Sequence, residues 1–291
     1  MTSTARFADY LELTKPRLSM LSVVTALVGY VTARPPFVLS ELLAVIIGTS
    51  LAAGGVAALN QWMEIDTDAQ MHRTASRPLP TGKIPPGSAF VLGWLMCIAA
   101  LGVLFVKANG LATLFTLLTM IAYVGWYTPS KRWSRWSTEI GALAGAFPPL
   151  IGWTAAENHI TALGWTLFGV LFFWQIPHFL AIGWMYRDDY SKVHFPMLPV
   201  RDPSGRYVAR WSLINTIALV VVSVVPVALG LTTVLYGAAA IGCGAWFTWR
   251  AIAFAREGNR EIAARQLFFT SIAYLPLVCG ALVIDRLFFA P

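Results

Sequence analysis

The chain has 291 residues, of which 57% are hydrophobic and only 12% are charged, and its formal net charge is +7. Together with a positive mean hydropathy, this composition excludes an ordinary soluble domain and indicates a polytopic membrane protein. The positive net charge follows from the excess of Lys and Arg in the cytoplasmic loops of a membrane protein, so we see no case for nucleic-acid binding.

Apolar runs of about the 20 residues that cross a bilayer recur along the whole chain. They predict nine helices, at about 17–34, 39–62, 88–107, 110–128, 138–156, 160–183, 212–231, 233–251 and 266–286. No low-complexity linker or soluble domain interrupts them. The expected fold is therefore all-α: residues 1–291 form one integral-membrane domain, a nine-helix transmembrane bundle with a central cavity open toward the cytoplasm.

The basic residues fix the expected orientation, because cytoplasmic loops carry an excess of Lys and Arg. With the N-terminus in the cytoplasm, 18 of the 21 basic residues lie on the inner side, and Arg34, Lys107 and Arg286 lie outside. The mixed charge of the first residues is unlike a signal peptide. We expect a multi-pass protein of the bacterial inner membrane, with the N-terminus cytoplasmic and the C-terminus outside.

The second predicted helix ends in a group of oxygen-bearing side chains. Asn60, Glu64 and Asp68 follow one another at four-residue spacing, which places them on one helical face. Such a set suits a hard divalent cation, and Mg²⁺ bound by few carboxylates completes its shell with water and phosphate. We therefore predict a Mg²⁺ site here, with Mn²⁺ as the alternative metal.

Basic side chains in the first and second predicted inner loops, at about 63–87 and 129–137, suit the phosphate itself. The residues are Arg73, Arg77 and Lys83 in the first loop, and Lys131 and Arg132, with Tyr127, in the second. The alternative is an ordinary solvated loop with internal ion pairs and, for the second loop, positive-inside topology alone.

A helix with buried polar residues also precedes the third predicted inner loop, at about 184–211. Gln175 and His178 lie within the predicted span, and Asp188 and Asp189 follow it. This is a weak internal repeat of the first unit, and two such units would enclose one cavity. Polar residues in a span face the bundle interior, although Gln61 and Gln175 could serve only as interhelical hydrogen-bonding groups. His178 follows Pro177, so a structural histidine is the other interpretation.

A metal and phosphate site that opens into an apolar bundle suits a substrate with a diphosphate head and a hydrocarbon tail. Isoprenyl diphosphates have this chemistry. Metal and basic side chains would stabilise the departing pyrophosphate, and a carbon nucleophile would capture the allylic cation in a water-poor pocket.

Ordered motifs over about residues 13–200 resemble the UbiA-type intramembrane prenyltransferases, and within them the protohaem IX farnesyltransferase (haem O synthase) branch. The first signature is Asn60-x-x-x-Glu64-x-x-x-Asp68, followed by Arg73-Thr74-x-x-Arg77-Pro78-Leu79-Pro80-x-Gly82. The other blocks are Leu13-Thr14-Lys15-Pro16-Arg17, Tyr127-Thr128-Pro129, Gly145-Ala146-x-Pro148-Pro149, Trp174-Gln175-x-Pro177-His178-Phe179, Asp189-Tyr190 and Pro196-Met197-Leu198-Pro199.

The resemblance implies transfer of a farnesyl group from farnesyl diphosphate to a vinyl group of haem b, with water added and pyrophosphate released. It implies catalytic roles for Asn60, Glu64, Asp68, Asp188 and Asp189, with Mg²⁺ held by Asn60, Glu64, Asp68 and Asp189. The implied diphosphate-binding residues are Arg17, Arg73, Arg77, Lys83, Tyr127, Lys131 and Arg132. Trp174, Gln175 and His178 would contact the porphyrin. The implied partners are membrane lipid and a downstream haem-modifying enzyme or terminal oxidase.

Two departures and two alternatives stand beside this interpretation. Phe179 and Tyr186 occupy positions at which many UbiA-type members carry acids, which favours the haem branch over the quinone branch. Ser130 stands where an apolar residue is commoner. A prenyltransferase acting on a quinone precursor such as 4-hydroxybenzoate is the nearer alternative. A secondary transporter is the other, but its polar residues should lie near the bilayer midplane.

Overall fold

The computed structural model describes residues 6–256 and 258–290, and every regular element in these ranges is a helix. The long helices are α2 (Pro16–Thr32), α3 (Leu39–Met63), α5 (Pro86–Lys107), α6 (Gly110–Met120), α10 (Ala162–Met185), α13 (Arg206–Ala228), α14 (Val234–Ala255) and α15 (Arg260–Phe288). The shorter ones are α1 (Phe7–Leu13), α4 (Ile65–Asp68), the π-helix η1 (Ile121–Tyr127), α7 (Thr128–Ser130), α8 (Ser137–Ala146), α9 (Pro148–Glu157), α11 (Arg187–Lys192) and α12 (Leu198–Arg201).

Seven segments of the described chain are long and apolar enough to cross a membrane. They correspond to seven of the nine predicted helices, and the span at 110–128 continues through η1 and α7 to Ser130. The helix predicted at 17–34 is α2, which has only 17 residues. The prediction of one helix over 138–156 is wrong, because the chain breaks at Phe147 between α8 and α9. Pro148 and Pro149 cause the break, since proline lacks the amide donor that an interior turn needs.

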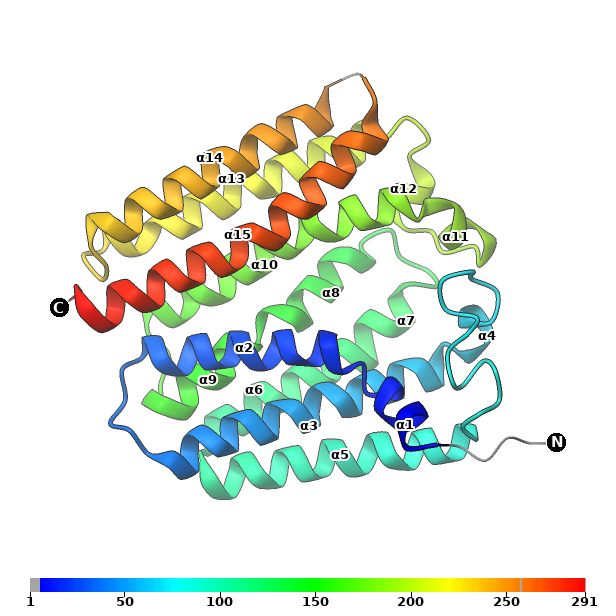
Figure 1. Ribbon diagram of the computed structural model, residues 1–291, viewed down its shortest axis with the longest axis horizontal. Helices are drawn as coiled ribbons and strands as arrows, with labels where there is room; N and C mark the ends of the chain where they lie inside the picture. The colour runs from blue at the N-terminus through cyan, green and yellow to red at the C-terminus, as the bar shows by residue number, and fades with distance from the viewer. Residues whose placement is uncertain (1–5, 257, 291) are drawn as a thin grey trace.

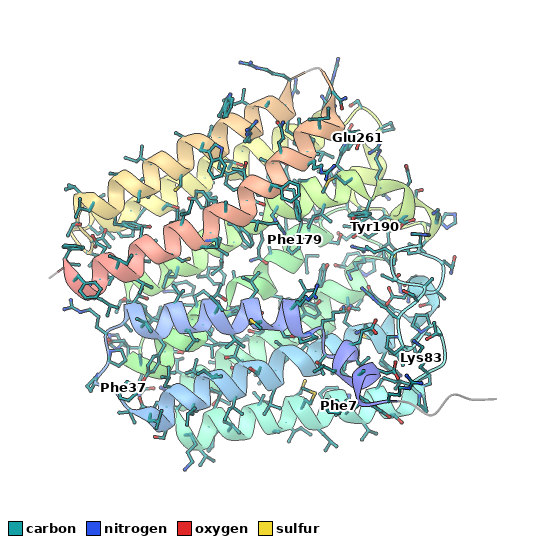
Figure 2. The ribbon with its side chains drawn as sticks, viewed as in Figure 1. Phe7, Phe37, Lys83, Phe179, Tyr190 and Glu261 are labelled. Carbon is teal, nitrogen blue, oxygen red and sulfur yellow. The ribbon has the colours of Figure 1, made fainter. Side chains whose placement is uncertain are left out.

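The helices run roughly side by side, so that the polar connections gather at two ends of the bundle (Figure 1). The short elements α1, α4, α7, α11 and α12 lie at one end, which we call the polar end. Figure 2 labels Lys83 and Tyr190 there and Phe37 at the opposite end. The three inner loops that the sequence predicts thus meet at one end of the molecule.

The interior is packed in two halves. One core cluster joins α10, α13, α14 and α15 through residues such as Phe247 and Tyr274, and another joins α2, α3, α6 and α9. α2 and α9 approach so closely that a Cβ at Gly152 would lie 1.7 Å from the Ala26 carbonyl oxygen. Small residues permit such close contact between helices in a membrane. The outward faces of the helices carry large apolar side chains such as Phe105 of α5, which is 68% exposed.

Candidate active site

The predicted ligand row lies at the junction of α3 and α4. The helix ends at Met63, and Glu64 (φ −108°, ψ 14°) turns the chain into the short helix α4. Backbone hydrogen bonds nevertheless continue across the break, from Glu64 N to Asn60 O at 3.1 Å and from Asp68 N to Glu64 O at 2.7 Å. The four-residue spacing therefore stacks the three side chains as predicted, and all three are at least 96% buried.

Each of these side chains contacts one cation. Lys15 Nζ donates to Asn60 Oδ1 at 3.0 Å. Lys131 Nζ lies 2.9 Å and 3.0 Å from the two carboxylate oxygens of Glu64, and Arg77 Nη1 lies 2.6 Å from Asp68 Oδ2. Asn60 Nδ2 also donates to Glu64 at 2.9 Å. Lys15, Asn60, Glu64 and Lys131 are joined by hydrogen bonds, and the Asp68–Arg77 ion pair lies one helical turn beyond Glu64. We call these six residues the polar cluster.

Lys15 is the functional residue that the sequence analysis missed, since it placed Arg17 in this role. Lys15 adopts a left-handed conformation (φ 47°) directly before Pro16, which begins α2. Gln61 Nε2 fixes this turn by donating to the Leu13 carbonyl at 2.7 Å. Burial, together with the charges of Arg77 and Lys131, lowers the pKa of Lys15 to about 7. Arg17 is exposed on the adjoining turn. The available signal was the Lys-Pro step that starts the helix.

The second loop supplies Lys131 through an irregular helix end. η1 is a π-helix, a form that is frequent at functional sites, and it places Thr128 so that its hydroxyl accepts from Asn60 Nδ2 at 3.1 Å. Lys131 Nζ lies 4.5 Å from the centre of the Tyr127 ring. Burial alone would lower the pKa of Lys131, but the Glu64 carboxylate raises it above its ordinary value. Lys131 is therefore a fixed positive charge.

The other predicted phosphate-binding residues lie around this cluster. Arg132 binds Asp66 at 2.6 Å on the surface and lowers the pKa of that carboxyl. Lys83 lies 3.9 Å from Asp9 of α1. Arg73 donates to the Tyr190 hydroxyl at 3.0 Å and packs over its ring, which joins the first loop to α11.

The predicted second acidic pair lies on α11. Asp188 is exposed, and Asp189 is bound to Lys192 at 2.8 Å. The Lys192 hydrogen bond lowers the pKa of Asp189, and the backbone amide of Arg73 adds to this effect. Asp189 is therefore next to the Arg73 loop, but its closest ion pair is local and not with the polar cluster.

The three predicted haem contacts on α10 point in different directions. Gln175 donates to the Ala142 carbonyl of α8 at 3.4 Å and to Leu171 at 3.0 Å. His178 and Trp174 stack on each other and both contact Ser271 of α15, through His178 Nδ1 at 2.7 Å and Trp174 Nε1 at 2.7 Å. Gly145 admits the Gln175 amide, since a Cβ there would lie 1.9 Å from Gln175 Oε1. Gly141 likewise packs closely, since a Cβ there would lie 2.7 Å from the Tyr127 ring.

The donor atoms of the polar cluster fit a magnesium ion. Asn60, Glu64 and Asp68 offer only oxygen ligands, which Mg²⁺ prefers. No group of three His, Cys, Asp or Glu residues able to hold a metal occurs within 6–256 and 258–290, so a metal here would need substrate oxygens. With Lys15 protonated, three cations face two carboxylates, and the excess charge suits an anion.

An apolar cavity extends from the polar cluster into the bundle. Lys15 stands at its mouth, and its walls come from α2, α3, α6, η1, α8 and α9. The lining residues are Lys15, Leu18, Ser19, Ser22, Thr49, Ala52, Ala53, Val56, Ala57, Thr119, Met120, Tyr123, Ala144, Gly145, Pro148 and Ile151. The polar cluster thus adjoins a cavity with mainly apolar walls.

Comparison with known sequences gives consistent matches over nearly the whole chain. A model of the UbiA prenyltransferase family matches residues 22–273. A protoheme IX farnesyltransferase from Opitutus terrae is 68% identical over 286 residues, which cover 98% of this chain and 97% of the relative. One from Solibacter usitatus is 43% identical and covers 96% and 98%.

Solved structures share the fold at low sequence identity. A digeranylgeranylglyceryl phosphate synthase superposes with a TM-score of 0.82 at 17% identity, covering 96% of this chain and 98% of that one. A UbiA homolog from Archaeoglobus fulgidus, bound to GPP and Mg²⁺, gives a TM-score of 0.69 at 13% identity, covering 94% and 99%.

Proposed function

The chain belongs to the UbiA prenyltransferase family, and from this premise we propose that it transfers a farnesyl group from farnesyl diphosphate to a vinyl group of haem b. The products are haem O and pyrophosphate. The curated relatives named protoheme IX farnesyltransferase support this substrate pair. The observation that carries the proposal is the buried polar cluster at the mouth of an apolar cavity.

The donor's diphosphate binds at the polar cluster. Asn60, Glu64 and Asp68 would hold Mg²⁺, which when bound would neutralise charge on the leaving pyrophosphate. Lys15, Arg77 and Lys131 exchange their present carboxylate and amide partners for phosphate oxygens, since charge-assisted bonds suit both kinds of acceptor. The net charge of the three cations and two carboxylates, the charge of the metal and the charge of a trianionic diphosphate then add up to zero.

The chain's residues perform the reaction by binding and by excluding water. The bond between farnesyl C1 and the bridging oxygen breaks, and pyrophosphate takes the electron pair. The terminal vinyl carbon of haem b bonds to C1, and a water molecule adds to the adjacent carbon and loses a proton. Apolar walls of the cavity limit hydrolysis of the allylic cation. The outer basic residues, Arg17, Arg73, Lys83 and Arg132, attract the anionic donor, and Tyr127 orients Lys131.

The acceptor site is proposed on α10. Trp174 and His178 offer stacked rings beside α15, and Gln175 lines the α8 side of the same helix. Asp188 and Asp189 act from the third loop, next to Arg73. A solved UbiA homolog bound to GPP and Mg²⁺ supports a divalent metal, and Mg²⁺ in preference to Mn²⁺ is part of the proposal.

The topology is proposed as nine membrane crossings, with α2 as the first and the α8–α9 pair as the fifth. The polar end then faces the cytoplasm of a bacterial inner membrane and the end of α15 lies outside. Arg34, Lys107 and Arg286 lie at or near helix ends away from the polar end, as the positive-inside rule requires. The haem product passes to a downstream haem-modifying enzyme or terminal oxidase.

Mass analysis of the haem formed by purified protein from haem b, farnesyl diphosphate and Mg²⁺ tests the proposal. We expect a product with the mass of haem b plus one farnesyl group and one hydroxyl group. If the protein instead prenylates 4-hydroxybenzoate and leaves haem b unchanged, the acceptor assignment is wrong and the quinone-precursor alternative holds.

A further inference from the structure

The lining of the apolar cavity stops at one level of the bundle, which we call its closed end. Its wall on α3 is formed by Thr49, Ala52, Ala53, Val56 and Ala57, which follow the 3.6-residue repeat of one helical face below Asn60. One turn beyond the deepest lining residues, three helices meet in the core. Ser22 is followed by Ala26 on α2, Thr49 by Val45 on α3, and Thr119 by Phe115 on α6.

Those three residues lie buried in the core just beyond the last lining residues. Ala26 and Val45 are 0% exposed, Phe115 is 6% exposed, and all three belong to one core cluster. None of them lines the cavity. Interiors packed at this density admit no further methylene groups without strain. A hydrocarbon chain that enters at Lys15 therefore ends at the level of Thr49.

At this end of the cavity, the Thr49 hydroxyl has no hydrogen-bond partner among the described residues. The Thr49 side chain is 2% exposed. The neighbouring Ser50, on the exposed face of α3, satisfies its hydroxyl by donating to the Ile46 carbonyl at 2.7 Å. Thr49 lines the cavity and lacks such a bond. A buried hydroxyl without a partner is costly, so this position is shaped for the cavity rather than for helix packing.

The depth of the cavity corresponds to one length of prenyl chain. From Ala57, just below the predicted metal ligand Asn60, to Thr49 is eight residues, or about 12 Å of helix. At the roughly 1.2 Å per bond of an extended chain, the eleven main-chain bonds of a farnesyl group span about 13 Å. A geranyl group spans about 8 Å and a geranylgeranyl group about 18 Å by the same rule.

We infer that Thr49, backed by Ala26, Val45 and Phe115, sets the upper limit of the prenyl chain length that this protein accepts. This inference rests on the proposed function, since it takes a prenyl diphosphate as the ligand. A ten-carbon chain leaves the last turn of the cavity empty. A twenty-carbon chain forces the closed end open.

The test measures binding of the thiolo-diphosphates of geraniol, farnesol and geranylgeraniol to the full chain with Mg²⁺. These probes do not react, so the result is independent of the acceptor. We expect the wild type to bind the farnesyl probe at least about tenfold more tightly than the geranylgeranyl probe. Thr49→Leu should weaken farnesyl binding about tenfold or more and leave geranyl binding unchanged.

Two further variants complete the design. Thr49→Ala deepens the cavity without adding atoms, so it should raise the affinity for the geranylgeranyl probe several-fold. Ser50→Leu adds the same side chain at the same depth on the exposed face of α3 and should bind like the wild type. Equal binding of all three lengths by the wild type, or matching profiles of Thr49→Leu and Ser50→Leu, would overturn the inference and leave prenyl transfer standing. If the wild type binds none of the three probes, both the inference and the proposed function fail.

Discussion

Two helix-loop units meet at the polar end, α3 with the loop after it and α10 with the loop after it. Their backbone conformations at the helix end are nearly the same, but their side chains differ. α3 ends at Glu64 with φ −108° and ψ 14°, and α10 ends at Tyr186 with φ −112° and ψ 18°. A short helix follows each break. With the two breaks aligned, Glu64 corresponds to Tyr186 and Asp68 to Tyr190, so the second unit carries phenols where the first carries buried carboxylates.

This difference is the reason for proposing the metal site in the first unit. Asp68 is 1% exposed and paired with Arg77, whereas Tyr190 accepts a hydrogen bond from Arg73 and bridges the two units. The acids of the second unit, Asp188 and Asp189, are offset by two and three residues from its break. Asp66 has the same offset in the first unit as Asp188 in the second, and both are solvent-exposed. The repeat therefore conserves the turn geometry, and only the first unit forms a buried anionic site.

The largest expected effect is at the first unit. Asp68→Ala should lower the rate of haem farnesylation about a hundredfold or more, because it removes a group that positions the charge of the leaving pyrophosphate. Asp66→Ala, on the same short helix but exposed, is the matched control and should cost only a few-fold. The rates are compared at saturating substrate, with the melting temperature as a check on folding. Near-normal turnover of Asp68→Ala would contradict the assignment.

Lys15→Ala should have the next largest effect. It removes a partly buried cation that contacts Asn60, so we expect about a tenfold to hundredfold loss of affinity for the farnesyl thiolo-diphosphate. Arg17→Ala, two residues away and exposed, is the control and should change the affinity less than threefold, roughly the effect of a surface charge. The measurement is equilibrium binding with Mg²⁺. If Arg17→Ala weakens binding more than Lys15→Ala, the original assignment from the sequence is the right one.

His178→Ala probes the second unit and should act on the acceptor alone. We expect about tenfold weaker haem b binding, measured by absorbance titration, and unchanged binding of the farnesyl probe. Ser271→Ala removes the hydrogen-bond partner of His178 and is the control for a structural role. A fall in melting temperature without any loss of haem affinity in folded His178→Ala would show that the histidine only packs α10 against α15.

The smallest effect is expected at Asp189. Asp189→Asn should reduce turnover by only a few-fold, because the carboxylate is partly exposed and its ion pair with Lys192 is a local surface pair. The turnover assay used for Asp68→Ala measures it. A loss as large as that of Asp68→Ala would break the comparison between the two units and establish a second metal site.

Sequence alone determined the features that depend on local spacing and composition. Four-residue spacing was enough to stack Asn60, Glu64 and Asp68, since the repeat of the helix survives the turn at Glu64. Hydropathy located the long helices, and the distribution of Lys and Arg predicted that the three inner loops lie at one end. The ordered motifs identified the family, which a single cluster could not have done.

Only the tertiary structure decided which of the polar residues share a site. Lys15 reaches Asn60 across 45 residues, and Lys131 reaches Glu64 across 67. Trp174 and Gln175 are adjacent in sequence, yet they face α15 and α8 respectively. Such partners depend on how whole helices pack, which is fixed by contacts between distant parts of the chain. The sequence pattern within one segment does not predict these contacts.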